Sequence, residues 1–180
     1  MTDSSDPAPQ PLPADDPSRE LALAQPDDDD APLPHISLAG DTYTILLTGE
    51  DTAGRYTLID MHVPPGGGPP PHRHDFEETF TIVEGQIEVT FRGVTSVIRA
   101  GETVHVPANA PHAFRNAADA PARLLCACSP PGQEKFFMAF GDRVPGRTSP
   151  PPELDDAAKG ARMANAKELA PLYRTALLIP

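Results

Sequence analysis

The sequence predicts an all-β domain folded as an antiparallel barrel or jelly roll. Between residues 41 and 128 the chain divides into short stretches rich in Thr, Val, Ile and Phe, and clusters of Gly, Pro and Asn separate these stretches. Apolar and polar residues alternate within several of them, as expected of strands that bury one face. Roughly 110 residues of this kind are enough to enclose one hydrophobic core.

The predicted strands follow one another closely. Two come before a loop of prolines and glycines at residues 63–71, and the pair His72 and His74 follows that loop in a further strand. A tight hairpin turn is expected at Arg92 and Gly93. Besides the histidine strand, the predicted strands cover residues 41–48, 55–63, 78–83, 86–91, 94–99, 103–106, 112–116 and 122–128.

The pattern changes to a helical period after residue 132. Residues 133–140 predict a short helix against the barrel, and residues 153–174 an amphipathic helix or helix pair interrupted near Pro171. We expect this extension to cover the barrel end or to contact a second copy. The aromatic residues of the first helix, with a neighbouring methionine, could line a pocket, although core packing is favoured. These residues are Phe136, Phe137, Met138 and Phe140.

The first 34 residues differ in composition from the rest of the chain. They hold eight prolines and nine acidic residues but one basic residue, Arg19. Such a segment buries too little apolar area to offset the entropy of ordering, so we predict a disordered tail. The predicted organisation is therefore a tail at 1–34, a barrel at 35–145 and a helical extension at 146–180.

Charge and hydropathy exclude several classes of partner. The formal net charge is −12 and no Lys/Arg cluster is present, which argues against nucleic-acid binding, since that depends on phosphate neutralisation. No stretch has the roughly 18 apolar residues of a membrane span, and no basic segment precedes an apolar one as in a signal peptide. We expect a cytoplasmic protein that binds no membrane.

Four side chains are candidate metal ligands. His72 and His74 stand two apart in a predicted strand and therefore point to the same face. Glu78 opens the next strand, and His112 opens a later one. Three imidazoles and one carboxylate suit divalent first-row metals and leave coordination positions open. An isolated H-x-H is more often a pair of solvated side chains, so the flanking pattern must decide.

The flanking pattern resembles the paired signature of the cupin superfamily. The first motif, G-x5-H-x-H-x3-E-x6-G, runs from Gly66 to Gly85, and the second, G-x5-P-x-G-x2-H-x3-N, from Gly101 to Asn116. Asn109 stands where the second motif usually has glycine. Because asparagine tolerates positive φ best after glycine, we expect the turn to survive. The resemblance covers residues 35–145 and is strongest to small single-domain cupins described as quercetin-dioxygenase-like.

The resemblance implies a function that the residues alone do not. It implies a double-stranded β-helix, a homodimer, and one divalent metal ion (Fe, Mn, Ni, Cu, Co or Zn) held by His72, His74, Glu78 and His112. Glu78 would be both ligand and catalytic base. The preferred function is a dioxygenase acting on a small aromatic or enolic compound. The alternatives are a metal-dependent isomerase, lyase or decarboxylase, and a non-catalytic small-ligand binder.

Several other polar residues are expected to have structural roles. His62 is interpreted as a surface or pocket-rim residue, His105 as outside the site, and Glu77 as a surface charge that faces away from it. Cys126 and Cys128 share one strand face. A disulfide between same-strand neighbours would be strained, and the sequence supplies no further soft ligands for a metal, so buried reduced thiols are expected.

Overall fold

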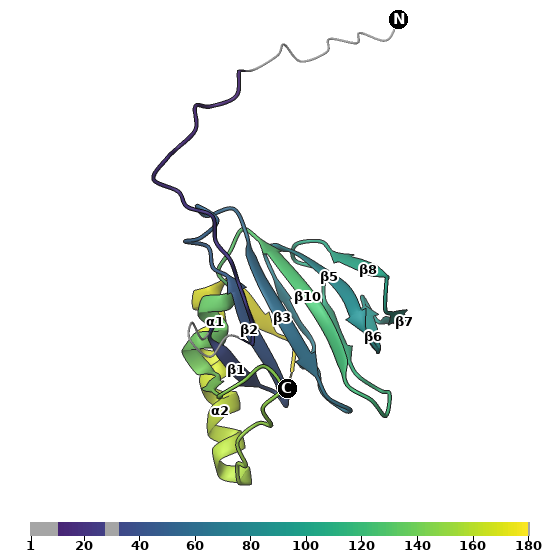
Figure 1. Cartoon of the computed structure of the whole chain (residues 1–180). Helices are drawn as coiled ribbons and strands as arrows, with labels where there is room; N and C mark the ends of the chain where they lie inside the picture. The colour runs from purple at the N-terminus through teal and green to yellow at the C-terminus, as the bar shows by residue number, and fades with distance from the viewer. Residues whose placement is uncertain (1–10, 28–32, 180) are drawn as a thin grey trace, which may run out of the picture.

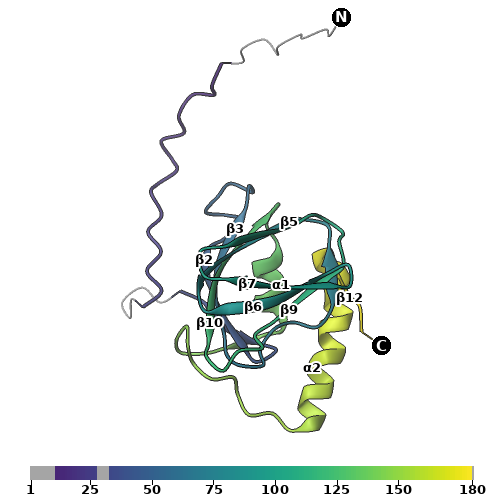
Figure 2. The same cartoon turned by 90° about the vertical axis from the view of Figure 1, so that its right-hand side faces the viewer.

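The chain folds into two antiparallel sheets that pack face to face as a jelly roll (Figures 1 and 2). The computed structural model describes residues 11–27 and 33–179. One sheet has seven strands, in the order β11 (Asp142–Arg143), β1 (His35–Leu38), β2 (Asp41–Leu47), β3 (Thr57–Val63), β10 (Ala122–Ser129), β5 (Glu77–Glu84) and β8 (Thr103–Val106). The other has five, in the order β12 (Thr175–Leu177), β4 (His72–His74), β9 (His112–Arg115), β6 (Gln86–Phe91) and β7 (Val94–Arg99).

Alternation along the strands builds the core between the sheets. On β10, the residues at every second position from Ala122 to Cys128 are buried, and the same holds on β5 from Glu78 to Ile82. Since successive strand residues point to opposite faces, this pattern directs one face of the seven-stranded sheet inward. The all-β fold and jelly-roll architecture predicted from the sequence are therefore confirmed.

The predicted strands occur close to their expected positions. Those at 86–91, 94–99 and 103–106 have the expected ends, and the helix at 133–140 is α1 (Gln133–Phe140). Arg92 and Gly93 both have positive φ, 50° and 85°, as the predicted hairpin turn requires. The short strands β1, β11 and β12 were not predicted, because each is two to four residues long and depends on pairing with a neighbour.

The C-terminal extension closes one side of the barrel. Helix α2 (Asp156–Leu169) is capped at its N-terminus by Asp155, whose side chain accepts a hydrogen bond from the Ala158 amide, and it runs into a 3-10 turn (Ala170–Tyr173). The strand β12 then pairs with β4, so the end of the chain becomes an edge strand beside the two histidines. Figure 1 shows α1 and α2 together on one side of the larger sheet.

The N-terminal segment has little regular structure where it is described. Residues 11–27 and 33–34 contain no helix or strand, and Leu12 and Leu21 are more than 90% exposed. Arg147 binds Asp27 at 2.9 Å. The predicted tail also includes residues 1–10 and 28–32, which lie outside the described residues. Among the described residues, no helix is both long and apolar enough to cross a membrane.

Asn116 connects the two sequence motifs. It is fully buried, and its side-chain amide donates to the carbonyls of Val63 and Ala120, both at 2.9 Å. Its backbone exchanges hydrogen bonds with the glycine loop, since the Gly66 amide donates to Asn116 and the Asn116 amide donates to Gly67. The end of the second motif therefore holds the loop that leads into the strand of His72.

The glycine loop passes too close to its neighbours for a side chain. A Cβ at Gly68, where φ is 129°, would lie 2.1 Å from the Phe114 carbonyl oxygen, and one at Gly67 would lie 2.1 Å from Asp41 Oδ1. Asp41 is itself fully buried and accepts a hydrogen bond from the Tyr43 hydroxyl at 2.8 Å. Burial raises the pKa of Asp41 to about 7, although the hydrogen bonds from Tyr43 and the Gly68 amide oppose the rise.

Asp41 should therefore make stability fall as pH rises. In the folded chain it keeps its proton up to a pKa of about 7, whereas the unfolded chain loses that proton above about 3.8, so folding becomes less favourable across this window. The loss is up to ~4 kcal/mol for a shift of about three units. In urea unfolding of the metal-free protein between pH 4 and pH 8, stability should fall more steeply with pH in the parent than in Asp41→Asn. Parallel pH profiles for the two proteins would contradict the assignment, and the exposed Asp119→Asn is the control for loss of one charge.

Candidate metal centre

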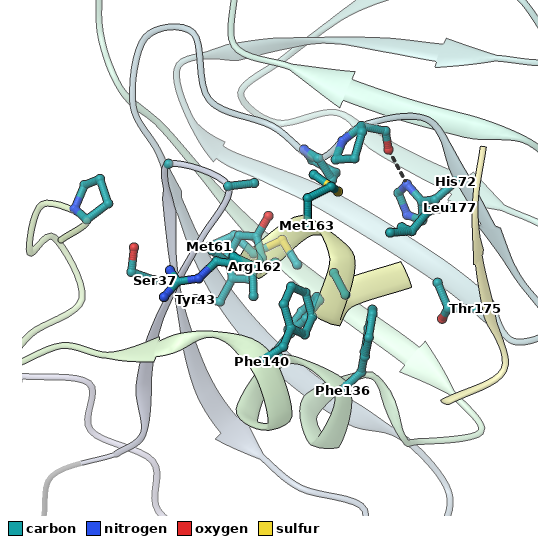
Figure 3. A pocket seen from close by; sticks show the side chains of 18 of the residues that line it. Ser37, Tyr43, Met61, His72, Phe136, Phe140, Arg162, Met163, Thr175 and Leu177 are labelled. Atoms are coloured by element: carbon teal, nitrogen blue, oxygen red, sulfur yellow. Dashed lines mark hydrogen bonds between the residues drawn. The ribbon is translucent and has the colours of Figure 1, made fainter. Parts of the chain in front are cut away.

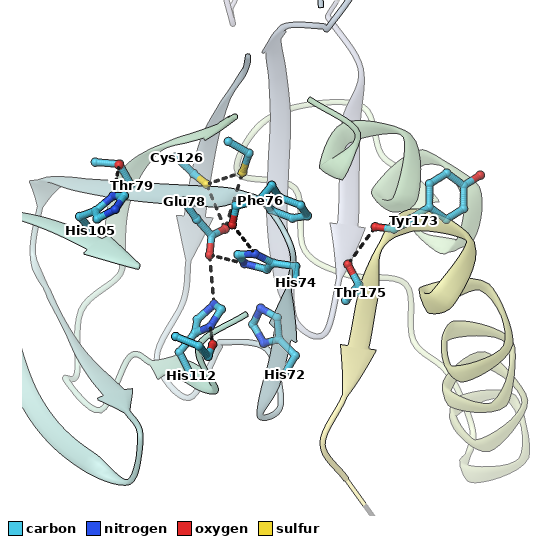
Figure 4. Close-up of polar contacts among 12 residues, drawn as sticks. His72, His74, Phe76, Glu78, Thr79, His105, His112, Cys126, Tyr173 and Thr175 are labelled. Carbon is cyan, nitrogen blue, oxygen red and sulfur yellow. Dashed lines mark hydrogen bonds and ion pairs between the residues drawn. The ribbon is translucent and has the colours of Figure 1, made fainter. Parts of the chain in front are cut away.

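Four side chains from the two sheets converge between them. His72 and His74 come from β4 and His112 from β9, both in the five-stranded sheet, while Glu78 comes from β5 in the other sheet. One ligand atom from each lies within 4.8 Å of the others, and the four side chains are between 2% and 6% exposed. Figure 4 shows the three imidazoles grouped around the carboxylate. The structure thus brings together the four candidate ligands named from the sequence.

The short ligand strand β4 is held from both sides. It pairs with β9 through His72 and His112, and with β12 through His74 and Thr175. The amide of Asn109 also donates to the His74 carbonyl at 2.6 Å. Asn109 has φ 66°, so the expectation that asparagine supports the turn normally made by glycine is confirmed.

Each histidine is oriented through its Nδ1 atom. His72 Nδ1 lies 2.9 Å from the Pro70 carbonyl, His74 Nδ1 lies 3.0 Å from that of Phe76, and His112 Nδ1 lies 3.0 Å from that of Ala110. A carbonyl oxygen can only accept, so Nδ1 must carry the proton in all three rings. In the neutral form Nε2 is then a bare lone pair, which is the state in which imidazole binds a metal.

The Nε2 atoms face an oxygen that is also an acceptor. Glu78 Oε2 lies 3.0 Å from His74 Nε2 and 3.1 Å from His112 Nε2. Two lone pairs at this distance repel each other in a buried setting unless a positive charge lies between them. Either a proton on a ring or a metal ion can supply that charge.

The shifts in pKa indicate which group takes the proton in the metal-free cluster. Burial lowers the pKa of His72 to about 4, assisted by the charge of His112. Burial opposes ionisation of Glu78, but its contacts with His112 and His74 outweigh burial and hold the pKa of this carboxyl well below its ordinary value. Burial would also lower the pKa of His112, but its hydrogen bond to Glu78 raises it instead. Near neutral pH, Glu78 is therefore ionised and His72 is neutral, and His112 holds a proton more readily than a free imidazole does.

The geometry also fits a metal ion. Two donors that each lie about 2.1 Å from an ion, at right angles to each other, are ~3.0 Å apart. The distances from Glu78 Oε2 to His74 and His112 match that spacing. Three imidazoles and a carboxylate suit divalent first-row transition metals, and four ligands leave coordination positions open. The four residues could therefore hold one such ion.

An apolar cavity of about 400 Å³ opens beside the cluster. His72 and Glu78 belong to its lining, so the cavity reaches the candidate metal position from one side. The remaining wall is mainly aromatic and aliphatic and comes from the barrel and from the C-terminal extension, as Figure 3 shows. Its apolar wall includes Tyr43, Met61, Phe80, Phe114, Phe136, Phe137, Phe140, Met163 and Leu177.

The remaining polar residues considered in the sequence lie outside the cluster. His105 Nε2 binds Glu77 at 2.9 Å on the surface, where both side chains are about half exposed. Glu77 is thus the surface charge that was expected. His62 is absent from the metal-ligand cluster among the described residues. Cys126 and Cys128 are free thiols and both are buried, as predicted.

The aromatic residues of α1 pack in the core, as the sequence favours, and also line the cavity. Phe136 and Phe137 are buried in the hydrophobic core, and Phe140 packs against it. All three also line the cavity. Thr175 and Leu177 of β12 line it as well, and no pattern in the sequence marks them as site residues. The signal for the cavity in the sequence is the close spacing of the phenylalanines of α1.

Comparison with known proteins decides the family of this region. The family model of the cupin domain matches residues 59–128, the stretch that contains all four candidate ligands. The chain contains a cupin domain. The two sequence motifs therefore lie in a domain of the fold that their spacing suggested. The C-terminal extension lies beyond the matched residues.

Two curated relatives match part of the chain. Quercetin 2,3-dioxygenase of Bacillus subtilis is 30% identical over 116 residues, which are 63% of this chain and 34% of the relative. Polyketide synthase CurC of Streptomyces cyaneus is 35% identical over 100 residues, which are 54% of this chain and 64% of the relative. The chain thus spans about a third of the first relative and somewhat under two thirds of the second.

Solved structures with the same fold extend the match beyond the cupin domain. The polyketide cyclase RemF from Streptomyces resistomycificus has a TM-score of 0.54 at 21% identity, covering 76% of this chain and 89% of that one. A predicted oxalate decarboxylase from Thermotoga maritima also has a TM-score of 0.54, at 20% identity, covering 60% of this chain and 98% of that one. At these identities the likeness concerns the fold.

Metal binding should compete with protonation of His112. Because Glu78 raises the pKa of His112 above its ordinary 6.5, an ion that binds near that pH must displace a proton. Metal affinity should therefore rise with pH through the His112 pKa and level off above it. Calorimetric titration in buffers of different ionisation enthalpy should show proton release on metal binding near pH 6.5, and less release per ion as the pH is raised. An affinity independent of pH over this range would contradict the assignment, and His105→Gln should behave as the parent.

Proposed function

We propose that this protein is a metal-dependent dioxygenase acting on a small aromatic or enolic compound. The observation that carries the proposal is that the metal-ligand cluster borders the apolar cavity. His72 and Glu78 belong to the cluster and also line the cavity. A substrate in the cavity would therefore lie against the open side of the ion. The similarity to quercetin 2,3-dioxygenase of Bacillus subtilis supports oxygenase chemistry.

The chain's residues have separable roles in this proposal. His72, His74, His112 and Glu78 hold the ion. The hydrogen bonds from Nδ1 of the three histidines to backbone carbonyls fix the orientation of the rings before the ion binds. A divalent ion held there supplies a Lewis acid that favours ionisation of an enol or phenol hydroxyl, and open positions for substrate and dioxygen. Glu78, which is ionised and borders the cavity, is the candidate acceptor for the proton of that hydroxyl.

The cavity selects the substrate by excluding water. Phe136, Phe140 and Met163 present rings and a thioether to it, which suit a flat apolar ligand. Arg162 also borders the cavity, but its guanidinium is paired with Asp142. A ligand would therefore be held mainly by apolar contact, with its oxygen atoms directed to the ion.

A second candidate uses the same ion without dioxygen. The similarity to polyketide synthase CurC favours a substrate from polyketide synthesis, whose enolic carbons can react under Lewis-acid activation alone. Such a protein would be an isomerase, lyase or cyclase with the same ligands and cavity. The two candidates differ in whether oxygen is consumed.

Oxygen uptake separates these functions. The metal-loaded protein should consume oxygen with members of a flavonol and β-diketone panel, and His74→Ala should abolish the uptake because it removes a ligand. His105→Gln, which changes a surface histidine, should retain it. Turnover that proceeds equally well without oxygen would overturn the dioxygenase in favour of the second candidate. Binding of the panel without any turnover would show a ligand-binding protein instead.

The cavity should lose affinity for apolar ligands when it acquires a charge. Phe140→Arg places a guanidinium in an apolar wall, where an unpaired charge is costly, so binding of the uncharged fluorescent dye N-phenyl-1-naphthylamine should weaken by at least about tenfold. Leu172→Arg is the control, because Leu172 is 75% exposed. Fluorescence titration measures both. Equal affinities for the two variants would show that the dye binds elsewhere.

A further inference from the structure

Two buried thiols lie behind Glu78, on the side away from the histidines. Cys126 and Cys128 are each 0% exposed, and their Sγ atoms are 3.6 Å apart. Both sit on the inward face of β10, which pairs with β5 so that Cys128 is opposite Glu78 and Cys126 is opposite Phe80. The proposed function assigns no role to either residue.

The two oxygens of Glu78 have different neighbours. Oε2 faces the Nε2 atoms of His74 and His112, whereas Oε1 lies 3.3 Å from Cys126 Sγ and 3.8 Å from Cys128 Sγ (Figure 4). Among the described residues, the hydrogen-bond partners of Oε1 are these two thiols. A thiol can donate to a carboxylate oxygen, so the S–H groups meet the need of a buried acceptor.

Packing alone does not account for these residues. Alanine or valine would fill the same space on an inward strand face, but would leave a buried carboxylate oxygen without a donor, which costs more than the lost packing. The remaining possibility is that the thiols bind a soft ion as thiolates, since the two sulfurs and Glu78 are close enough to do so. In that arrangement Glu78 would either turn away from the histidines or bridge two ions, one at the thiols and one at the histidines.

We propose that Cys126 and Cys128 are positioning residues, which hold Glu78 Oε1 by S–H hydrogen bonds so that Oε2 alone is presented to the metal ion. The inference rests on the proposed metal site. A carboxylate held in this way binds through one oxygen and leaves a further coordination position for a ligand from the cavity. Because S–H is a weak donor, it orients the carboxylate while leaving most of its negative charge on the metal side.

Cobalt titration tests the proposal, because the spectrum of bound Co²⁺ reports on its ligands independently of any activity. The metal-free parent should bind one Co²⁺ per chain without a sulfur-to-cobalt charge-transfer band. Cys126→Ala should weaken cobalt binding by about tenfold, the usual effect of losing one hydrogen bond to a charged group, and should change the ligand-field bands. Cys126→Ser, which restores a hydrogen-bond donor, should recover most of the cobalt affinity and most of the parent's ligand-field spectrum. Ala127→Ser, between the cysteines on the opposite strand face, is the matched control and should leave both unchanged.

Each result has a separate meaning. A parent that takes up no cobalt overturns the proposed metal site itself. A parent that binds cobalt with the same affinity and spectrum as Cys126→Ala and Cys128→Ala overturns the positioning role while leaving the metal site standing. A sulfur-to-cobalt band in the parent that disappears in the cysteine variants shows thiolate ligation and also overturns it.

A measurement on the parent keeps the proposal open to refutation if the alanine variants do not fold. The S–H stretching band in the infrared spectrum moves to lower frequency when a thiol donates to a carboxylate. The frequency of this band should change when the parent is loaded with metal, because the ion draws negative charge from Glu78 and weakens the hydrogen bond from the thiol. An S–H band at the position of a free thiol, unchanged by metal, would contradict the hydrogen bonds.

Discussion

The site depends on one unfavourable contact that a cation relieves. Glu78 Oε2 lies about 3 Å from two imidazole nitrogens whose rings are already committed, through Nδ1–H, to backbone carbonyls. In a buried setting, lone pairs facing a carboxylate are costly, and a positive charge between them stabilises the cluster. A proton on His112 would supply that charge, and so would a divalent ion held by the four side chains.

Much of the barrel serves to hold these four groups in place. The strand of His72 and His74 is three residues long, too short to be stable by itself, and it is fixed by β9, by β12 and by the Asn109 amide. Asn116 ties the glycine loop before that strand to the strand of His112. The C-terminal extension therefore has two functions in the structure: it walls the cavity and it pairs with the ligand strand.

The cluster of candidate ligands could be predicted from the sequence because its determinants are local. The alternation of a strand places His72 and His74 on one face whatever lies around them, and the motif spacing identified Glu78 and His112. Asn109 was also predictable, because positive φ is a property of a single residue. The helix at 133–140 and most strand ends could be predicted in the same way, from the spacing of apolar residues and from the positions of turn residues.

The features that were not predicted depend on tertiary contacts. Strand β12 has three unremarkable residues and exists because β4 offers it a free edge. The approach of Cys126 to Glu78 depends on the register of β10 against β5, which shifts between Arg123 and Leu124, and no local pattern encodes that shift. The aromatic residues of α1 have an evident apolar character and pack in the core, but that they also line a cavity depends on α2, which packs against α1 and supplies part of the same lining.

A crystal structure of metal-loaded protein, with diffraction data collected on both sides of the metal absorption edge, tests the central claim most directly. We predict one anomalous peak per chain, enclosed by Nε2 of His72, His74 and His112 and by Oε2 of Glu78. A peak at the two thiols or at surface carboxylates instead of this position would contradict the account. So would the absence of a peak from crystals of protein soaked with Mn²⁺, Fe²⁺, Ni²⁺ and Co²⁺ in turn.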